Sequence, residues 1–406
     1  MTASALQRLI TPTNLRSTWE AFWPHARKQH SCGVDGVTPA EFHERATRNL
    51  AKLHDELRIG YRFSLLRAHP IPKKDGKTFR IICVPTVRDR IVQRLLAKHL
   101  TDVSEKLGII NKASFGFIRN SEGCRRGVVP ARDYAIQLRN LHRWAYKSDI
   151  SSFFDRIPRD ELVGQTISAL RTRSLKCLLA GAANCEIDDN EPSIRRIAHK
   201  NGIQKGLGVR QGMPLSPIFS NVILKSFDEA MVGQGYNLVR YADDFLVLAD
   251  SEKQCLEIDD FARSTLRKLH FDLPPLGPEH SKTRIVGPES EIEFLGLALA
   301  PTRNGAYELL ITPQQLENIK QSVAALNDVE RLVSAGIDIT NFGKLVDDKI
   351  GGYAAAYDVA TNSAVLRSLL TKMRAEILGS IFRRAFGDDK VRALPSRYRK
   401  FFSLEV

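Results

Sequence analysis

The sequence predicts an α+β fold, in which helices accompany small antiparallel sheets. Three observations lead to this prediction. Apolar residues on both sides of Asp243-Asp244, in NLVRYADDFLVLAD, are typical of two short buried strands joined by a tight turn. Residues 71–84 have the pattern of a second, basic hairpin. Apolar residues at helical spacing occupy 252–270 and recur in the last hundred residues.

Composition limits the class of partner. The chain has 406 residues and a formal net charge of +14, which is enough chain for a sizeable core and points to a polyanionic partner. It contains no run of about twenty apolar residues and no signal-peptide pattern at its start, so we expect a cytoplasmic protein that binds nucleic acid rather than a membrane. Its six cysteines form no CxxC pair, which favours reduced thiols over disulfides or a zinc site.

Residues 1–60 are predicted to form a helical N-terminal extension. Trp19, Phe22 and Trp23 supply apolar anchors. A further helix is expected after Thr38, because Thr38 is a good N-cap and Glu41 stands three residues later, as in a capping box.

The next stretch, 61–94, is strongly basic. Lys74-Asp75-Gly76-Lys77 is a turn signal between the β-prone runs HPIP and TFRIICV. A hairpin with cations on its tip and flanks suits a phosphorylated ligand, either a triphosphate or the phosphates of a template.

Asp149 follows an apolar and aromatic run and opens the strand-like segment DISSFF. We therefore expect it at a strand end facing the Asp243-Asp244 turn. Adjacent carboxylates repel each other unless a cation neutralises them, which favours a hard divalent metal such as Mg²⁺. The alternative for an isolated Asp-Asp pair is a solvated turn.

Between these two sites the chain is predicted to be helical and then irregular. The acidic insertion CEIDDNEPSIRR contains Asp188-Asp189 without flanking strands, which indicates a solvated loop. A glycine-rich turn follows, and a helix is expected to begin around Ser216-Pro217.

These motifs together resemble those of reverse transcriptases. YADD, DISSFFD and QGMPLSP resemble motifs C, A and B of that family and occur in the family's order. IPKKDGKTFRIICVPTVRDRIVQ resembles the fingers block of group II intron-type and other bacterial enzymes, SKT resembles motif D, and EFLGL resembles motif E. The resemblance covers roughly residues 35–300. It implies a right-hand polymerase with fingers at 61–148, a palm at 149–300 with interleaved fingers elements, and a helical thumb at 301–406.

The resemblance also implies the catalytic groups. Asp149, Asp243 and Asp244 would hold two Mg²⁺ ions, with Mn²⁺ as a substitute, for RNA-directed DNA synthesis. Lys282 in SKT would be the general acid that protonates the leaving pyrophosphate, or else an ordinary surface lysine.

Further roles follow for the nucleotide site. Lys73 and Arg80 would bind the β- and γ-phosphates, although Lys74 or Lys77 fits the role of Lys73 equally well. A bulky aromatic at Phe154 implies exclusion of the ribose 2′-hydroxyl and hence selection of deoxynucleotides. The other expected nucleotide contacts are Gln211, Gly212 and Tyr241.

For template and primer, the resemblance implies a role for Phe115 and Phe117 near the template base, by stacking or only as core. Phe294, Leu295 and Gly296 would grip the primer strand. The basic helices that follow suit a thumb that tracks the duplex.

The expected partners are an RNA template, deoxynucleoside triphosphates and the cDNA product. The chain resembles stand-alone bacterial reverse transcriptases that act in defence against phage, several of which copy a dedicated structured non-coding RNA. Rival roles within the class are a CRISPR-associated enzyme, a retron enzyme and a truncated intron protein. Rivals outside it are an RNA-binding, maturase-like scaffold and template-independent or protein-primed DNA synthesis.

Overall fold

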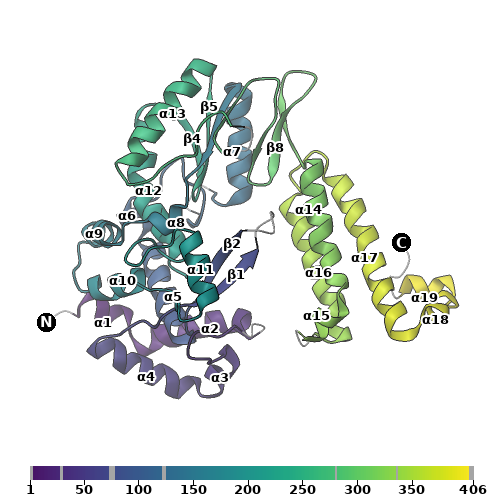
Figure 1. Cartoon of the computed structure of the whole chain (residues 1–406), viewed down its shortest axis with the longest axis horizontal. Helices are drawn as coiled ribbons and strands as arrows, with labels where there is room; N and C mark the ends of the chain where they lie inside the picture. Colours follow the sequence, from purple (N-terminus) through teal and green to yellow (C-terminus); the bar gives the residue numbers. More distant parts are fainter. Residues whose placement is uncertain are drawn as a thin grey trace. The chain divides into compact units, whose positions relative to one another are not determined.

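The computed structural model describes residues 3–27, 31–72, 78–120, 125–278, 281–334 and 337–401. It confirms the predicted α+β class, because helices accompany three small sheets with the strand orders β1-β2, β4-β5-β3-β6 and β7-β8-β9 (Figure 1).

Contacts within the chain divide it into two compact units. The first comprises Met1–Gly127 and Tyr146–Ile285, and the second comprises Val128–Ala145 and Val286–Val406. The chain passes between the units three times, after Gly127, within β3 and within β6. The predicted boundaries of fingers, palm and thumb stay predictions.

The first unit begins with helices and a hairpin. In chain order the elements are α1 (Ala5–Leu9), α2 (Pro12–Ala26), α3 (Pro39–Glu44), α4 (Ala46–Ile59), β1 (Arg67–Pro72), β2 (Phe79–Val84), α5 (Val87–Asp102) and α6 (Ser104–Leu107). The capping box predicted at Thr38 is present, since its side chain accepts from the Glu41 N–H and the Glu41 carboxylate accepts from the Thr38 N–H. The hairpin pairs antiparallel, with Arg67 opposite Val84.

A four-stranded sheet lies at the centre of this unit. It contains β3 (Trp144–Asp149), β4 (Asn237–Tyr241), β5 (Asp244–Ala249) and β6 (Arg284–Val286), in the order β4-β5-β3-β6. Helix α12 (Ser216–Gly233) packs against β4, and α13 (Glu252–Arg267) packs against β5. Between β3 and α12 lie α8 (Phe153–Arg156), α9 (Arg159–Leu170), α10 (Lys176–Ala183) and α11 (Pro192–Lys200).

The second unit combines a small sheet with a helical bundle. The sheet contains β7 (Ile292–Phe294), β8 (Leu297–Pro301) and β9 (Tyr307–Leu310), and α7 (Val128–Leu141) packs on it. The bundle is built from α14 (Pro313–Ala324), a 3₁₀ turn (Ala325–Asn327), α15 (Val329–Ser334), α16 (Ile339–Ala356), α17 (Ser363–Phe386), α18 (Asp388–Arg392) and α19 (Ser396–Phe401). Thr312 caps α14 as predicted.

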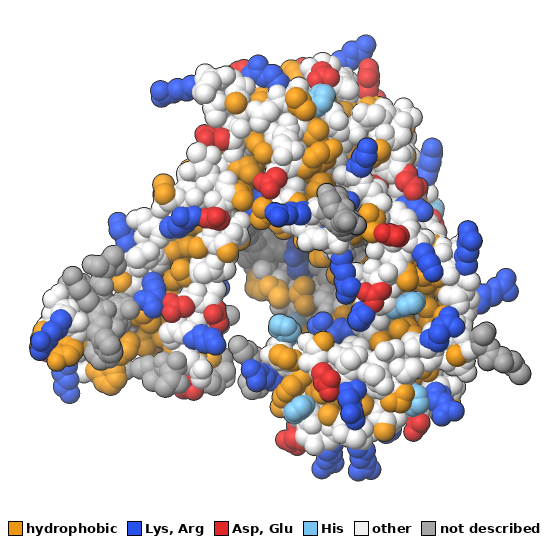
Figure 2. Space-filling model, turned by 180° about the vertical axis from the view of Figure 1, so that it is seen from behind, with side chains coloured by type: hydrophobic (Ala, Val, Ile, Leu, Met, Phe, Trp, Pro, Cys, Tyr) orange, Lys and Arg blue, Asp and Glu red, His pale blue; other side chains and the backbone are white. Residues whose placement is uncertain are grey.

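The surface agrees with the basic composition. Figure 2 shows Lys and Arg side chains distributed over the visible face rather than gathered in one patch. Within the described ranges, no helix is both long and apolar enough to cross a membrane.

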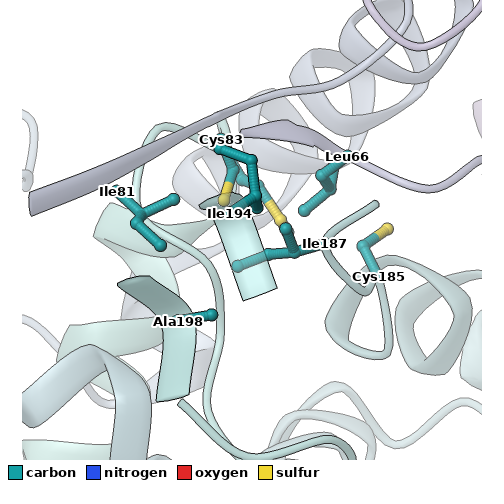
Figure 3. Close-up of a cluster of buried hydrophobic side chains, with 8 residues drawn as sticks. Leu66, Ile81, Cys83, Cys185, Ile187, Ile194 and Ala198 are labelled. Carbon is teal, nitrogen blue, oxygen red and sulfur yellow. The ribbon is translucent and has the colours of Figure 1, made fainter. Parts of the chain in front are cut away.

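The acidic insertion is partly core, which corrects the prediction of a solvated loop. Cys185 and Ile187 are buried in one cluster with Ile81 and Cys83 of the β1-β2 hairpin (Figure 3). Ile187 forms a parallel bridge with Leu66. The rest of the cluster is Ile194, Ala198 and Met213. The prediction failed because alternate apolar residues of CEIDDNEPSIRR are buried, while Asp188 and Asp189 stay partly exposed.

Candidate active site

The acidic turn has the predicted hairpin geometry. Tyr241 pairs with Asp244 at the end of the antiparallel β4-β5 ladder, so Ala242 and Asp243 form a two-residue turn. Ala242 has a φ of +57°, a left-handed conformation that is unfavourable for a residue with a Cβ. The residues around the turn must therefore hold it in this conformation.

Asp149 lies at the end of β3, beside β5 in the sheet. The Ile150 N–H donates to the Asp243 carbonyl over 3.2 Å, which joins the strand end to the acidic turn. The prediction that Asp149 opens a strand is wrong. The strand ends there because the chain turns at Ser152, whose φ is +47°, and enters the short helix α8.

Two lysines lie against these carboxylates. Lys282 Nζ donates to Asp149 Oδ2 over 2.7 Å, and Lys147 Nζ lies 3.5 Å from Asp244 Oδ1. The Lys282 side chain remains 66% exposed, so it can leave Asp149 without unpacking the core. The Lys147 contact was not predicted.

Burial and mutual repulsion act on the acidic groups. Burial, with a further contribution from the charge of Asp149, raises the pKa of Asp243 to about 6. Burial also raises the pKa of Asp244, although Lys147 lowers it in part. Both carboxylates would gain from a nearby cation, because a positive charge favours their ionised form.

The chemistry of these donors fits a divalent metal. Carboxylate oxygens are the ligands that Mg²⁺ prefers, and the buried Asp244 Oδ1 has only the longer 3.5 Å contact with Lys147 Nζ. Within the part of the chain that the structure describes, no group of three or more His, Cys, Asp or Glu is already arranged to hold a metal ion. The metal-binding role of Asp149, Asp243 and Asp244 therefore stays a prediction.

A cavity of about 380 Å³ brings six of the predicted residues together. It lies within the first unit, between the β2 strand, the α8 turn and the acidic hairpin. The predicted residues on its wall are Arg80, Asp149, Phe154, Gln211, Asp243 and Lys282.

Phe153 and Phe154 both line the cavity, and their ring centroids lie 5.2 Å apart, but the two side chains differ in burial. Phe153 is buried and contacts Phe271, with ring centroids 5.0 Å apart. Phe154 is only half-buried and lies on the cavity wall near Asp149. This placement is compatible with the predicted role of Phe154 in selecting the sugar.

Gly212 is required by a contact within the protein. Its φ is +99°, and a Cβ there would lie 2.5 Å from the Cys83 carbonyl oxygen of β2. The neighbouring Gln211 carbonyl accepts from the Cys83 N–H over 2.7 Å. These contacts fix the turn of QGMPLSP against the hairpin and place Gln211 on the cavity wall. The predicted contact of Gly212 with a nucleotide stays a prediction.

Arg80 lies on β2 and lines the cavity. Lys73 lies outside the described residues, as do Lys74 and Lys77. The predicted phosphate contact of Lys73 is therefore without a structural description.

The aromatic residues of ASFGF divide between core and surface. Phe115 is buried, and the Arg126 guanidinium lies 5.3 Å from its ring centre. Phe117 is exposed, and its ring centre lies 5.5 Å from that of Tyr241. Phe117 is thus available to a base, whereas Phe115 packs.

Motif E forms a tight hairpin in the second unit. Phe294 is fully buried, and Leu295 and Gly296 form the turn between β7 and β8, both with positive φ. The Leu295 carbonyl accepts from the Arg132 guanidinium. Phe294 thus anchors the turn in the core, and the predicted contact of Phe294, Leu295 and Gly296 with the primer stays a prediction.

Sequence reasoning missed several residues of this region. Lys200 and Asn201, which come after the acidic insertion in the chain, line the cavity. The Asn201 amide donates to the Phe79 carbonyl over 3.0 Å. Arg240, directly before the tyrosine of YADD, is completely buried. A buried arginine requires an acidic partner, but no local pattern identifies a partner twelve residues away on another element.

Comparison with known proteins decides the family. Residues 71–299 match the family model described as reverse transcriptase (RNA-dependent DNA polymerase), which is more than half of the chain. The chain belongs to the reverse transcriptase family. It is an RNA-directed DNA polymerase with the polymerase fold of that family, and the matched range includes Asp244 and all the residues that line the cavity.

Relatives of this reverse transcriptase include a bacterial protein and a yeast protein. Protein YkfC of Escherichia coli (strain K12) is 30% identical over 370 residues, which cover 79% of this chain and 90% of YkfC. The putative COX1/OXI3 intron 2 protein of Saccharomyces cerevisiae is 27% identical over 42% of this chain, but the matched part is only 18% of that protein.

Solved structures similar to this reverse transcriptase were also found. A partial Cas6-RT-Cas1–Cas2 complex aligns at 21% identity with a TM-score of 0.36, over 66% of this chain and 42% of that chain. Telomerase from Candida albicans, solved with a fragment of telomeric RNA, aligns at 14% identity with a TM-score of 0.36, over 88% of this chain and 69% of that chain.

Proposed function

We propose that the cavity is the polymerisation site, in which Asp149, Asp243 and Asp244 bind two Mg²⁺ ions and the chain copies RNA into cDNA. The observation that carries this proposal is the shared cavity of Arg80, Asp149 and Asp243. A cation, two carboxylates and a nucleotide-sized space in one place suit a triphosphate and its metal ions. When bound, the ions would activate the primer 3′-hydroxyl and stabilise the leaving pyrophosphate.

The residues of the chain then have distinct tasks. Arg80, with Lys73 or a neighbouring lysine, binds the phosphates and offsets negative charge on them. Lys282 releases Asp149 and donates a proton to the pyrophosphate oxygen. The Phe154 ring occupies the space that a 2′-hydroxyl would need. Gln211 contacts the nucleotide from its place beside β2.

Template and primer contacts are proposed at the surface turns. Phe117 and Tyr241 lie together at the acidic turn, where an exposed ring can stack on a base. The turn at Leu295-Gly296 contacts the primer strand.

The test of this chemistry is primer extension on an RNA template with the double variant Asp243→Asn/Asp244→Asn. We expect deoxynucleotide incorporation to fall by at least about a thousandfold, because the charges that hold the metal ions are gone. Asp188→Asn/Asp189→Asn is the matched control, since this acidic pair lies outside the cavity wall. Equal activity of the two double variants would overturn the assignment.

The proposal extends to the template and the biological role. We propose that the enzyme copies a dedicated structured non-coding RNA in the bacterial cytoplasm and that this cDNA synthesis serves defence against phage. The support is the resemblance of its motifs to intron-type and stand-alone bacterial enzymes, together with the net charge of +14.

The role is tested by purifying the protein from its native locus and sequencing the RNA and DNA that accompany it. We expect one abundant short RNA together with complementary DNA, and we expect the DNA to be absent from Asp243→Asn/Asp244→Asn. Phage should form fewer plaques on cells that carry the wild-type protein than on cells that carry this double variant. Spacer-derived, retron-type or intron RNA would instead assign a rival role. DNA without matching RNA would indicate untemplated or protein-primed synthesis, and RNA without DNA would indicate a scaffold.

A further inference from the structure

Arg240 uses all of its hydrogen-bond donors inside the protein. Its side chain is completely buried on β4, and Asp228 of α12 is 1% exposed. The guanidinium Nε donates to Asp228 Oδ1 over 2.6 Å and Nη2 donates to Asp228 Oδ2 over 2.5 Å, which is a bidentate pair. Nη2 also donates to Ser114 Oγ over 3.0 Å, and Nη1 donates to Asn221 Oδ1 over 3.2 Å.

The fifth donor reaches the catalytic turn. Arg240 Nη1 donates to the Ala242 carbonyl over 2.9 Å. Ala242 is the left-handed residue that precedes Asp243, so this bond restrains the strained position of the turn. A lysine in place of Arg240 has three donors and no planar fork, and it cannot satisfy all of these partners at once.

The partners of Arg240 also hold the neighbouring backbone. The Asn221 amide donates to the Gly116 carbonyl over 2.8 Å. Gly116 packs so closely on the turn that a Cβ there would lie 3.0 Å from the Ala242 nitrogen and 3.3 Å from the Tyr241 ring. One set of buried side chains thus joins the turn, helix α12 and the segment that carries Phe117.

A purely structural role is the competing explanation. A buried ion pair is weak evidence for stability, because desolvation of both charges offsets their attraction. A structural pair would also need partners for the guanidinium N–H groups that the carboxylate leaves over. The feature that points beyond stability is the place of one bond, because the Ala242 carbonyl belongs to the left-handed residue directly before Asp243.

We propose that Arg240 is a positioning residue, which, with Asp228 and Asn221, holds the Ala242 carbonyl and thereby fixes Asp243 and Asp244 in the geometry needed for catalysis. This inference rests on the proposed function of the acidic turn. It assigns no contact between Arg240 and substrate.

The first measurement compares Arg240→Lys with the wild type in steady-state primer extension, per folded molecule. We expect kcat to fall by about ten- to a hundredfold, because a displacement of the catalytic carboxylates by about 1 Å has effects of this size. The KM for deoxynucleotides and the Kd for the template–primer duplex should change less than about threefold. Arg263→Lys is the matched control, since Arg263 also bonds an aspartate, Asp259, and the backbone carbonyls of Leu273 and Pro274.

The decisive measurement is a double-mutant cycle with Ala242→Gly. Glycine adopts positive φ without the cost that alanine incurs, so it should replace part of the restraint that Arg240 supplies. We expect Ala242→Gly to restore kcat at least about threefold in the Arg240→Lys background and to give no increase in the wild type. A fold-stabilising role predicts additive effects on kcat. Additivity, or an unchanged kcat in Arg240→Lys, would overturn the inference.

Two further variants keep the result interpretable. If Arg240→Lys does not fold, Ser114→Ala removes one acceptor and leaves the ion pair, and the same cycle with Ala242→Gly applies to it. Asp243→Asn separates the inference from the function on which it rests. Loss of activity in Asp243→Asn with normal kcat in the positioning variants would reject only the positioning role, whereas full activity of Asp243→Asn would reject the proposed function itself.

Discussion

Phe154 is the side chain whose replacement tests nucleotide selection directly. We expect Phe154→Ala to accept ribonucleotides, with the ratio of kcat/KM for a deoxynucleotide to that for its ribonucleotide falling by about tenfold or more. The reason is steric, because the half-buried ring occupies part of the cavity wall near Asp149. Phe154→Tyr keeps the ring and is the control that should retain discrimination. An unchanged ratio in Phe154→Ala would place the selecting group elsewhere.

The raised pKa of Asp243 predicts how the free energy of unfolding depends on pH. Its pKa is raised to about 6 in the folded protein, above the ordinary value of 3.8. Between about pH 4 and 6 the folded state therefore binds a proton that the unfolded state has released, so the free energy of unfolding falls as pH rises through this range.

Asp243→Asn removes this ionisation. In metal-free protein we expect the variant to be more stable at pH 7 by about 1–3 kcal/mol and to lose stability less between pH 4 and 6. Denaturant unfolding at several pH values measures both. Asp188→Asn serves as the control, and a pH profile of Asp243→Asn identical to that of the wild type would contradict the prediction.

At the scale of elements, the turn before α12 depends on one glycine. We expect Gly212→Ala to destabilise the first unit by about 2 kcal/mol or more, because the new Cβ would meet the Cys83 carbonyl oxygen at 2.5 Å in addition to the cost of positive φ. Gly206→Ala isolates the backbone cost, since Gly206 has a φ of +79° and no atom within 4 Å of its Cβ position. Thermal unfolding of both variants measures the two losses of stability. Equal losses would show that the surrounding structure adjusts to the new Cβ at residue 212.

Elements marked by local chemistry were predictable from the sequence. The Thr38 capping box, the Thr312 cap and the YADD hairpin each follow from neighbouring residues, and each is present. DISSFF was misread because the left-handed Ser152 has no local signature, and an aromatic run suits a strand as well as a short buried helix.

The residues of the cavity were only partly predictable, because motifs mark some of them and long-range packing places the others. Asp149, Phe154 and Gln211 were found through their motifs. Lys200 and Asn201 were missed because their position depends on the packing of α11 against the β1-β2 hairpin in the cluster of Figure 3. Contacts between distant segments of this kind leave no periodic pattern in the chain.

For the whole molecule, charge sets the expected response to salt. With a formal net charge of +14, binding of a template–primer duplex should weaken steeply as salt rises, because each phosphate contact releases counterions. A plot of log Kd against log salt from 50 to 200 mM should be linear, with a slope that corresponds to several phosphate contacts. An affinity independent of salt would show that the basic surface does not meet the nucleic acid.

The buried arginine network also determines when the site can form. Asn111 bonds Asp228 across 117 residues of sequence, and Arg240 bonds Ser114 across 126. Contacts at such separations form late and slowly, since the chain must close large loops before it gains their energy. During synthesis the acidic turn therefore stays unrestrained until both ends of these loops have emerged and met. A nascent chain thus acquires its ability to polymerise in one late step of folding, rather than gradually with each strand.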